Sequence, residues 1–190
     1  MTITFCTGLM GSGKSSQLIE DFISSKKRRA AVSVQLAKEI GTLGKVESRN
    51  GKFLPSLNIN SKLPDDSISY LAKIFDVGDL EEIYIDEIQF LSSKSVKMII
   101  ELSEEKHVDV RFYGLETTFL NDYFESSKYL LEVVKKENIK RIDMMCQKEN
   151  CNLIASHNAR ISRGKVSKAG ELFVSEKNTY LSLCSDHYFE

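Results

Sequence analysis

The stretch Gly8-Leu9-Met10-Gly11-Ser12-Gly13-Lys14-Ser15 decides the fold that this chain is expected to adopt. It fits the pattern G-x-x-x-x-G-K-[ST] of a phosphate-binding loop. Glycines in such a loop let backbone N–H groups turn inward around phosphate oxygens. The lysine of the pattern, Lys14, would reach the β- and γ-phosphates, and the hydroxyl of Ser15 would hold Mg²⁺. The stretch therefore predicts a site for a nucleotide and magnesium.

The segments on either side of this loop have the character that the motif requires. Thr2 to Cys6 is short, β-branched and aromatic, which indicates a buried strand. Ser16 to Ile23 places Leu18, Ile19 and Phe22 at helical spacing. A glycine-rich turn without a ligand is the alternative, and the order of strand, glycine loop and helix disfavours it.

The bulk properties are those of an ordinary globular domain. The chain has 190 residues, of which 42% are hydrophobic and 28% are charged, so we expect one domain or one with a small appendage. The net charge of −1 gives no general attraction to nucleic acid or membranes. The N-terminus lacks the layout of a signal peptide, and no apolar run approaches the ~18 residues of a membrane span. We expect a cytoplasmic protein whose cysteines are reduced or bound to metal.

The segment after the first helix offers two basic features. The run Lys26 to Arg29 is typical of a solvated helix end, and a nucleic-acid patch is the less favoured interpretation.

Ala31 to Leu36 alternates between apolar and polar residues, as a strand does. Gly41 to Pro55 is rich in glycine and predicts a flexible loop. Arg49 in this loop would act as a positive clamp on phosphates, or would lie on a solvated connection without a role.

Two adjacent carboxylates follow a second buried strand. Glu82 to Leu91 begins as an apolar strand and carries Asp86 and Glu87. Asp86 is expected to bind Mg²⁺ through water, as the second element of a phosphate-loop site. Because side chains alternate along a strand, Glu87 would point elsewhere, toward a substrate. The alternative is a solvated strand end without function.

The rest of the first 135 residues alternates between helices and strands. Ser67 to Phe75 and Ser92 to Lys106 predict amphipathic helices, and Val108 to Tyr113 predicts a strand. Residues 114–119 follow that strand, where parallel α/β sheets bind ligands. Phe119, which lies in that segment, is by default a core residue. The alternation predicts a parallel sheet with helices on both faces, in a domain of residues 1–138.

Residues 139–190 predict a second, β-rich unit. Ile139 to Met145 and Cys151 to Ile161 have the character of strands around a short turn. Two spaced pairs, C-x₄-C and C-x₂-H, are separated by 33 residues, and together they fit a tetrahedral structural zinc site. The expected ligands are Cys146, Cys151, Cys184 and His187. Scattered free thiols are the alternative.

The order of these motifs resembles the type II thymidine kinases, the cellular and bacterial kind. The matching segments are GLMGSGKS, IDEIQF, YGLETTF, C-x₄-C and TYLSLC-x-x-H-Y, and they extend over nearly the whole chain. The resemblance implies a RecA-like domain with a small zinc-ribbon-like lobe. It also implies a homotetramer that uses ATP, Mg²⁺ and structural Zn²⁺ to phosphorylate the 5′-hydroxyl of thymidine.

The same resemblance assigns roles to individual residues. Glu87 would be the general base, and Asp86 and Gln89 would belong to the nucleotide site together with residues 8–15. Gly170 to Tyr180 would form a lasso loop over the base. The positions matching nucleoside contacts are Met10, Phe90, Leu115, Phe119, Phe124, Asn158, Val174 and Tyr180.

Three positions depart from the family pattern. The segment from Lys38 to Leu43 lacks the usual Asp-x-Arg, Ser175 and Glu176 replace a Gly-Gly, and Glu116 stands where bacterial members often carry Arg. These departures leave open a non-catalytic or weakly active nucleotide-binding regulator derived from this fold. A second alternative, independent of them, is another phosphate-loop NTPase acting on nucleic acid.

Overall fold

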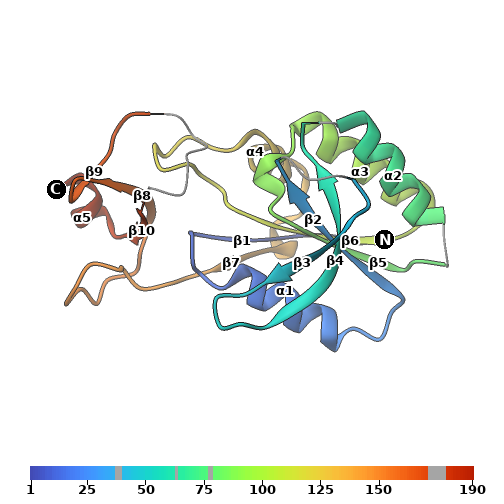
Figure 1. The fold of residues 1–190 in the computed structure, drawn as a ribbon, viewed down its shortest axis with the longest axis horizontal. Coiled ribbons are helices and arrows are strands. Elements are labelled where there is room, and N and C mark those ends of the chain that lie inside the picture. Colours follow the sequence, from blue (N-terminus) through green and yellow to red (C-terminus); the bar gives the residue numbers. More distant parts are fainter. Residues whose placement is uncertain (37–39, 63, 77–78, 171–178) are drawn as a thin grey trace.

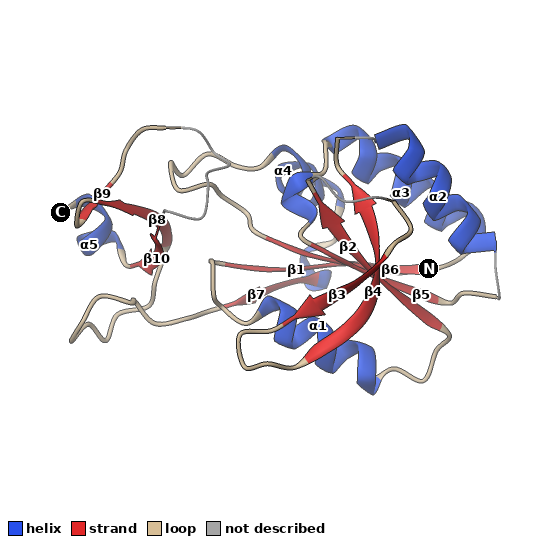
Figure 2. Ribbon diagram, in the orientation of Figure 1, coloured by secondary structure: helices blue, strands red, loops and turns tan. Residues whose placement is uncertain are grey.

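The structure is a computed structural model that describes residues 1–36, 40–62, 64–76, 79–170 and 179–190 (Figure 1). Its larger part is a twisted sheet with helices on both faces, and its smaller part is an antiparallel sheet near the C-terminus (Figure 2). This arrangement confirms the fold class that the sequence predicts. Within the described residues, no helix combines the length and apolar character that a membrane crossing needs.

Seven strands of the described chain form the large sheet, in the order β3-β4-β2-β5-β6-β1-β7. All neighbours pair in parallel except β3 and β4, which are antiparallel. The strands are β1 (Ile3–Gly8), β2 (Arg29–Gln35), β3 (Leu43–Glu47), β4 (Phe53–Asn60), β5 (Glu82–Asp86), β6 (Asp109–Gly114) and β7 (Ile139–Ile142).

Alternation along the central strands builds a separate core on each face of this sheet. Phe5, Ile85 and Phe112 pack on one face, whereas their neighbours on the strands, such as Cys6 and Tyr84, pack on the other. The first face is covered by α2 (Pro64–Asp76), α3 (Ser93–Lys106) and α4 (Glu125–Val133), and the second by α1 (Lys14–Ser24). Figure 1 shows these helices on opposite sides of the sheet.

The prediction that Gly41 to Pro55 form a flexible loop is wrong. These residues form most of a hairpin, in which β3 pairs with β4 from Leu43↔Leu57 to Glu47↔Phe53. Buried Val46 and Leu54 face each other in this register and pack near α1. The turn of this hairpin, at residues 48–52, places the Arg49 guanidinium against Gly11 of the phosphate loop.

The structure differs from the predicted second unit in two respects, one being that the strand expected from Cys151 begins only at His157. β7, which was expected to begin that unit, pairs in parallel with β1 of the large sheet, from Phe5↔Ile139 to Gly8↔Ile142. The smaller sheet has the order β10-β8-β9 and is followed by a short helix, α5. Its elements are β8 (His157–Ser162), β9 (Lys165–Val166), β10 (Thr179–Leu183) and α5 (Ser185–Phe189). The division of the chain after residue 138 stays a prediction.

Helix α3 begins with a side-chain cap at Ser92. The hydroxyl of Ser92 accepts a hydrogen bond from the backbone N–H of Ser95 at 3.1 Å. The helix ends at His107, whose backbone is left-handed (φ 56°). The substitution Ser92→Ala should therefore lower the free energy of unfolding by about 1 kcal/mol. Urea denaturation measures this change, and Ser69→Ala on the exposed face of α2 is the control. Equal stabilities of the two variants would contradict the cap.

Candidate active site

The phosphate loop joins the end of β1 to the start of α1, as its sequence predicts. Gly11 and Gly13 have φ angles of 79° and 93°, in the left-handed region that favours glycine. Gly13 is also the N-cap of α1, so the N–H groups of the first helical turn open toward the loop. This geometry offers an anion several backbone donors and the positive end of a helix dipole.

Lys14 lies over the loop that precedes it. Its Nζ donates hydrogen bonds to the carbonyl oxygens of Leu9 at 2.8 Å and Gly8 at 3.3 Å. Burial lowers the pKa of Lys14, and the nearby carboxylates of Glu87 and Asp86 oppose that effect. The amine is thus held at the loop and can exchange its carbonyl partners for phosphate oxygens.

Asp86 meets the phosphate loop at the carboxyl end of β5. The Ser15 hydroxyl donates a hydrogen bond to Oδ2 of Asp86 at 3.4 Å, and the Asp86 side chain is buried. Burial and the charge of Glu87 raise the pKa of Asp86 to about 7. A hydroxyl and a carboxylate are hard oxygen ligands, so this pair fits Mg²⁺. A divalent cation here would favour the ionised carboxylate that burial alone disfavours.

Glu87 follows Asp86 in a strained backbone conformation. Its φ of 62° and ψ of 39° are left-handed, which is uncommon for a residue other than glycine and costs energy. The turn directs Glu87 into the cavity beside the phosphate loop, whereas Asp86 stays beneath Ser15. The two carboxylates therefore have separate surroundings, as the sequence predicts.

Gln89 holds this turn in place. Its Nε2 donates to Oε2 of Glu87, and its Oε1 accepts a hydrogen bond from the backbone N–H of Leu115 at 3.2 Å. The Gln89 side chain is buried and lies next to Gly114, where a β-carbon would come within 2.8 Å of Oε1. Its amide thus connects the end of β6 to Glu87.

One cavity of about 760 Å³ brings most of the predicted residues together. The phosphate loop and Glu87 form one side, and aromatic residues and the small sheet form another. Predicted site residues that line it are Met10, Gly11, Gly13, Lys14, Ser15, Glu87, Gln89, Phe90, Leu115, Phe119, Phe124, Asn158 and Tyr180. The lining of this cavity does not include Gly8, Leu9, Ser12 or Asp86. Val174, Ser175 and Glu176 belong to residues 171–178, outside the described chain.

Arg49 from the β3–β4 turn also lines this cavity. A β-carbon added to Gly11 would lie 2.6 Å from Nη1 of Arg49, so the guanidinium packs directly on the phosphate loop. Two lysines of the hairpin are engaged in exposed ion pairs, Lys45 with Glu47 and Lys52 with Glu20. Arg49 therefore lies beside the phosphate loop, and its role as a clamp on phosphates stays a prediction.

The aromatic wall of the cavity joins both parts of the molecule. The rings of Phe119 and Tyr180 lie with centroids 6.3 Å apart at an interplanar angle of 65°. The guanidinium of Arg160 lies over the Phe119 ring, 4.1 Å from its centroid. A planar, mostly apolar ligand group would fit against such a wall.

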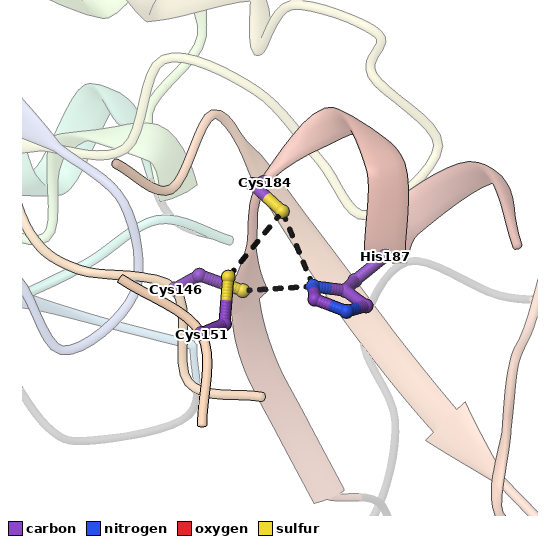
Figure 3. A group of neighbouring side chains, drawn as sticks. All are labelled: Cys146, Cys151, Cys184 and His187. Carbon is purple, nitrogen blue, oxygen red and sulfur yellow. Dashed lines mark hydrogen bonds between the residues drawn. The ribbon is translucent and has the colours of Figure 1, made fainter. Parts of the chain in front are cut away.

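The predicted metal ligands meet in the smaller part (Figure 3). The ligand atoms of Cys146, Cys151, Cys184 and His187 all lie within 4.8 Å of one another. The Sγ atoms of Cys151 and Cys184 are 3.9 Å apart, and Sγ of Cys146 lies 3.6 Å from Nδ1 of His187. A tetrahedral zinc site with Zn–S bonds of about 2.3 Å places its sulfur atoms roughly 3.8 Å apart. The residues present therefore fit Zn²⁺.

The electrostatics of the cluster also suit a metal. Burial raises the pKa of Cys146, but hydrogen bonds from the backbone of Cys184 and Lys148 and from the side chains of His187 and Cys151 lower it to about 6 overall. The thiolate is the form that binds metal ions. His157, which lies outside this cluster, stacks on Tyr188 with ring centroids 4.5 Å apart.

The loop, the buried carboxylate beside it and the shared cavity define a phosphate-loop nucleotide-binding protein with space for a second substrate. Residues 1–188 match the family model described as thymidine kinase, and the chain belongs to the thymidine kinase family. The resemblance drawn from the motifs is thus confirmed.

Individual relatives agree with this assignment. The chain is 48% identical over 189 residues to a thymidine kinase of Bacillus subtilis subsp. natto, covering 100% of this chain and 97% of that one. It is 30% identical over 188 residues to a thymidine kinase of Streptococcus pyogenes serotype M3, with coverages of 96% and 94%. Among solved structures, Bacteroides Pif1 bound to ssDNA shares 16% identity, with a TM-score of 0.37 over 74% of this chain and 38% of that chain. Similarity at that level says nothing about activity.

The structure adds site residues that the sequence did not indicate. Ser182 and Thr117 contact Met10 and Asn158 at the junction of the two sheets. No local spacing or charge pattern distinguishes a serine hydroxyl that bonds to a distant backbone, or a backbone oxygen, like that of Thr117, that accepts from a distant side chain. The pairing of β8 with β10 places Ser182 beside Asn158.

Burial makes the ionised form of the Asp86 carboxylate, the form that would bind Mg²⁺, unfavourable for the stability of the fold. Its folded pKa of about 7 exceeds the unfolded value, so the ionised group destabilises the fold as pH rises from about 4 to 7. In protein without nucleotide or Mg²⁺, Asp86→Asn should raise the free energy of unfolding by about 1–4 kcal/mol at pH 8. Urea denaturation at pH 5 and pH 8 measures this, and the gain should shrink at pH 5. A variant less stable than the parent at pH 8 would contradict the burial cost.

Proposed function

We propose that this chain transfers the γ-phosphoryl group of ATP to the 5′-hydroxyl of thymidine and releases dTMP. The observation that carries this proposal is that the phosphate loop and the Glu87 carboxylate open into the same cavity. A hydrolase needs only a water beside the phosphates. A kinase needs a bounded pocket for an acceptor, and the aromatic wall with Asn158 supplies one.

On the donor side, residues 8–15 would hold the phosphates of ATP. Lys14 would neutralise charge on the β- and γ-phosphates, and Ser15 would ligate Mg²⁺, with Asp86 acting through water. The metal, when bound, supplies neutralising charge at the transferring group. The hydrogen bond between Ser15 and Asp86 supports this pairing, because it brings both oxygen ligands to one point.

On the acceptor side, Glu87 would accept the proton of the 5′-hydroxyl as the new P–O bond forms. Gln89 would keep its carboxylate in place through their hydrogen bond, which gives Gln89 a positioning role rather than direct contact with ATP. The proposed nucleoside contacts are Met10, Phe90, Leu115, Phe119, Phe124, Asn158 and Tyr180, all of which line the cavity. Val174 is proposed on the resemblance alone.

Arg49 would complete the charge on the donor side. Its guanidinium packs on Gly11, so it can meet the γ-phosphate opposite Lys14. This supply of charge comes from the hairpin, whereas the family's usual Asp-x-Arg is missing after the second strand.

The remaining features follow the family pattern. The Cys₃His cluster would hold a structural Zn²⁺, since four protein ligands leave no open position for a substrate. We propose a homotetramer in the cytoplasm, with thymidine and ATP as partners and no role in nucleic-acid binding.

The variant Glu87→Gln tests the acceptor chemistry. Removing the base should lower kcat for thymidine by about 10²–10⁴-fold and leave the Kd for ATP nearly unchanged. A radiolabel transfer assay and calorimetry measure the two quantities. Glu116→Gln is the matched control, because Glu116 pairs with Arg141 at the same edge of the sheet. Near-normal turnover of Glu87→Gln would refute the base assignment.

The variant Arg49→Ala tests the clamp. Loss of the guanidinium should reduce kcat by about 10–10³-fold, with a smaller change in KM for thymidine. Lys52→Ala removes the same charge from the same hairpin but only breaks a surface pair with Glu20, so it should retain kcat. Parallel steady-state kinetics compare them. If both variants lose activity equally, the effect is one of net charge and the clamp is wrong.

A further inference from the structure

Two hydrogen bonds attach the small sheet to the phosphate loop at a single residue. The backbone N–H of Met10 donates to Oδ1 of Asn158 at 2.8 Å. The hydroxyl of Ser182 donates to the backbone oxygen of Met10 at 2.7 Å. Met10 is the third residue of the loop, so both of its backbone polar groups are fixed by residues about 150 or more positions away in sequence.

Asn158 and Ser182 form one rigid unit. They face each other on the antiparallel strands β8 and β10, and both side chains are buried. Nδ2 of Asn158 also donates to the backbone oxygen of Thr117 at 2.9 Å. Buried polar groups with all these partners resist displacement, because a broken bond would leave an unsatisfied group.

Ser182 is in turn tied to the metal ligands. Its backbone N–H donates to Oε1 of Gln147 at 2.7 Å, and the backbone N–H of Gln147 donates to the Ser182 oxygen at 2.9 Å. Gln147 directly follows Cys146, and Ser182 lies two residues before Cys184. A metal that draws Cys146 and Cys184 together therefore also fixes the pairing of Gln147 with Ser182.

We propose that metal occupancy of the Cys₃His cluster sets the conformation of the phosphate loop, and hence the affinity for the nucleotide, through Ser182 and Met10. The zinc lobe then acts on the donor site as well as on the acceptor pocket. Ser182 is a positioning residue, since it touches Met10 and no substrate phosphate. This inference rests on the proposed nucleotide site but not on the identity of the acceptor.

This coupling leads us to expect a measurable change in the Kd for the nucleotide when Ser182 is replaced. Ser182→Ala leaves the Met10 carbonyl without its donor, and one such hydrogen bond is equivalent to about a five-fold change in an equilibrium constant. The Kd of the zinc-loaded protein for a non-hydrolysable ATP analogue should rise by about that factor, with unchanged zinc content. By linkage, the analogue should tighten zinc binding by the same factor by which zinc tightens the analogue.

The experiment is a thermodynamic cycle between metal removal and Ser182→Ala, read by calorimetry of analogue binding. Zinc content is measured on the same samples, and circular dichroism checks the large domain after chelation. The control Ser156→Ala removes a hydroxyl from the same lobe that bonds only to Ser185 in the described structure. We expect metal removal to weaken binding in the parent and in the control, and to weaken it much less in Ser182→Ala.

Each outcome decides the proposal. Non-additive effects of metal removal and Ser182→Ala support it, and additive effects overturn it. If chelation unfolds the large domain, comparison of the zinc-loaded variants decides, and equal Kd values for Ser182→Ala and Ser156→Ala overturn it. Because only binding of the analogue is measured, failure here leaves thymidine phosphorylation untouched, and absence of analogue binding in the parent would instead refute the proposed nucleotide site.

Discussion

The parallel pairing of β1, β6 and β5 is the constraint on which the rest of the site depends. It brings the carboxyl ends of three strands to one edge of the sheet, with Thr7 opposite Gly114 and Ile85 opposite Phe112. One part of the site lies at the end of each strand: the phosphate loop follows β1, the two carboxylates lie at the end of β5, and residues of the cavity wall follow β6. Sequence separations of about 30 to 100 residues thus become hydrogen-bond distances, as between Ser15 and Asp86.

The position of the small sheet is also related to this edge of the large sheet. It lies over the carboxyl ends of the strands and contributes Asn158 and Tyr180 to the cavity. A lobe with so small a core needs additional stabilisation, and four converging metal ligands can supply it. Its hydrogen bonds to Met10 connect this lobe to the phosphate loop as well as to the wall of the cavity.

The sequence predicted those parts of the site whose chemistry is local. The phosphate loop, the Asp86–Glu87 pair and each of the two ligand pairs lie within a few residues of sequence, although the two ligand pairs are 33 residues apart. The β3–β4 hairpin was missed because Gly41, Gly44 and Gly51 suggest a loop. Gly44 instead admits the close approach of the Asn58 side chain. The sheet membership of β7 and the bond of Ser182 to Met10 depend on tertiary contacts that no single segment encodes.

The central claim is that one cavity holds a phosphoryl donor and a nucleoside acceptor. The most direct measurement is transfer of label from γ-labelled ATP in the presence of a panel of deoxynucleosides, with and without DNA. The account predicts label in a deoxynucleoside 5′-monophosphate, with thymidine as the preferred acceptor and no stimulation by DNA. Label only in inorganic phosphate, or hydrolysis that DNA accelerates, would contradict it.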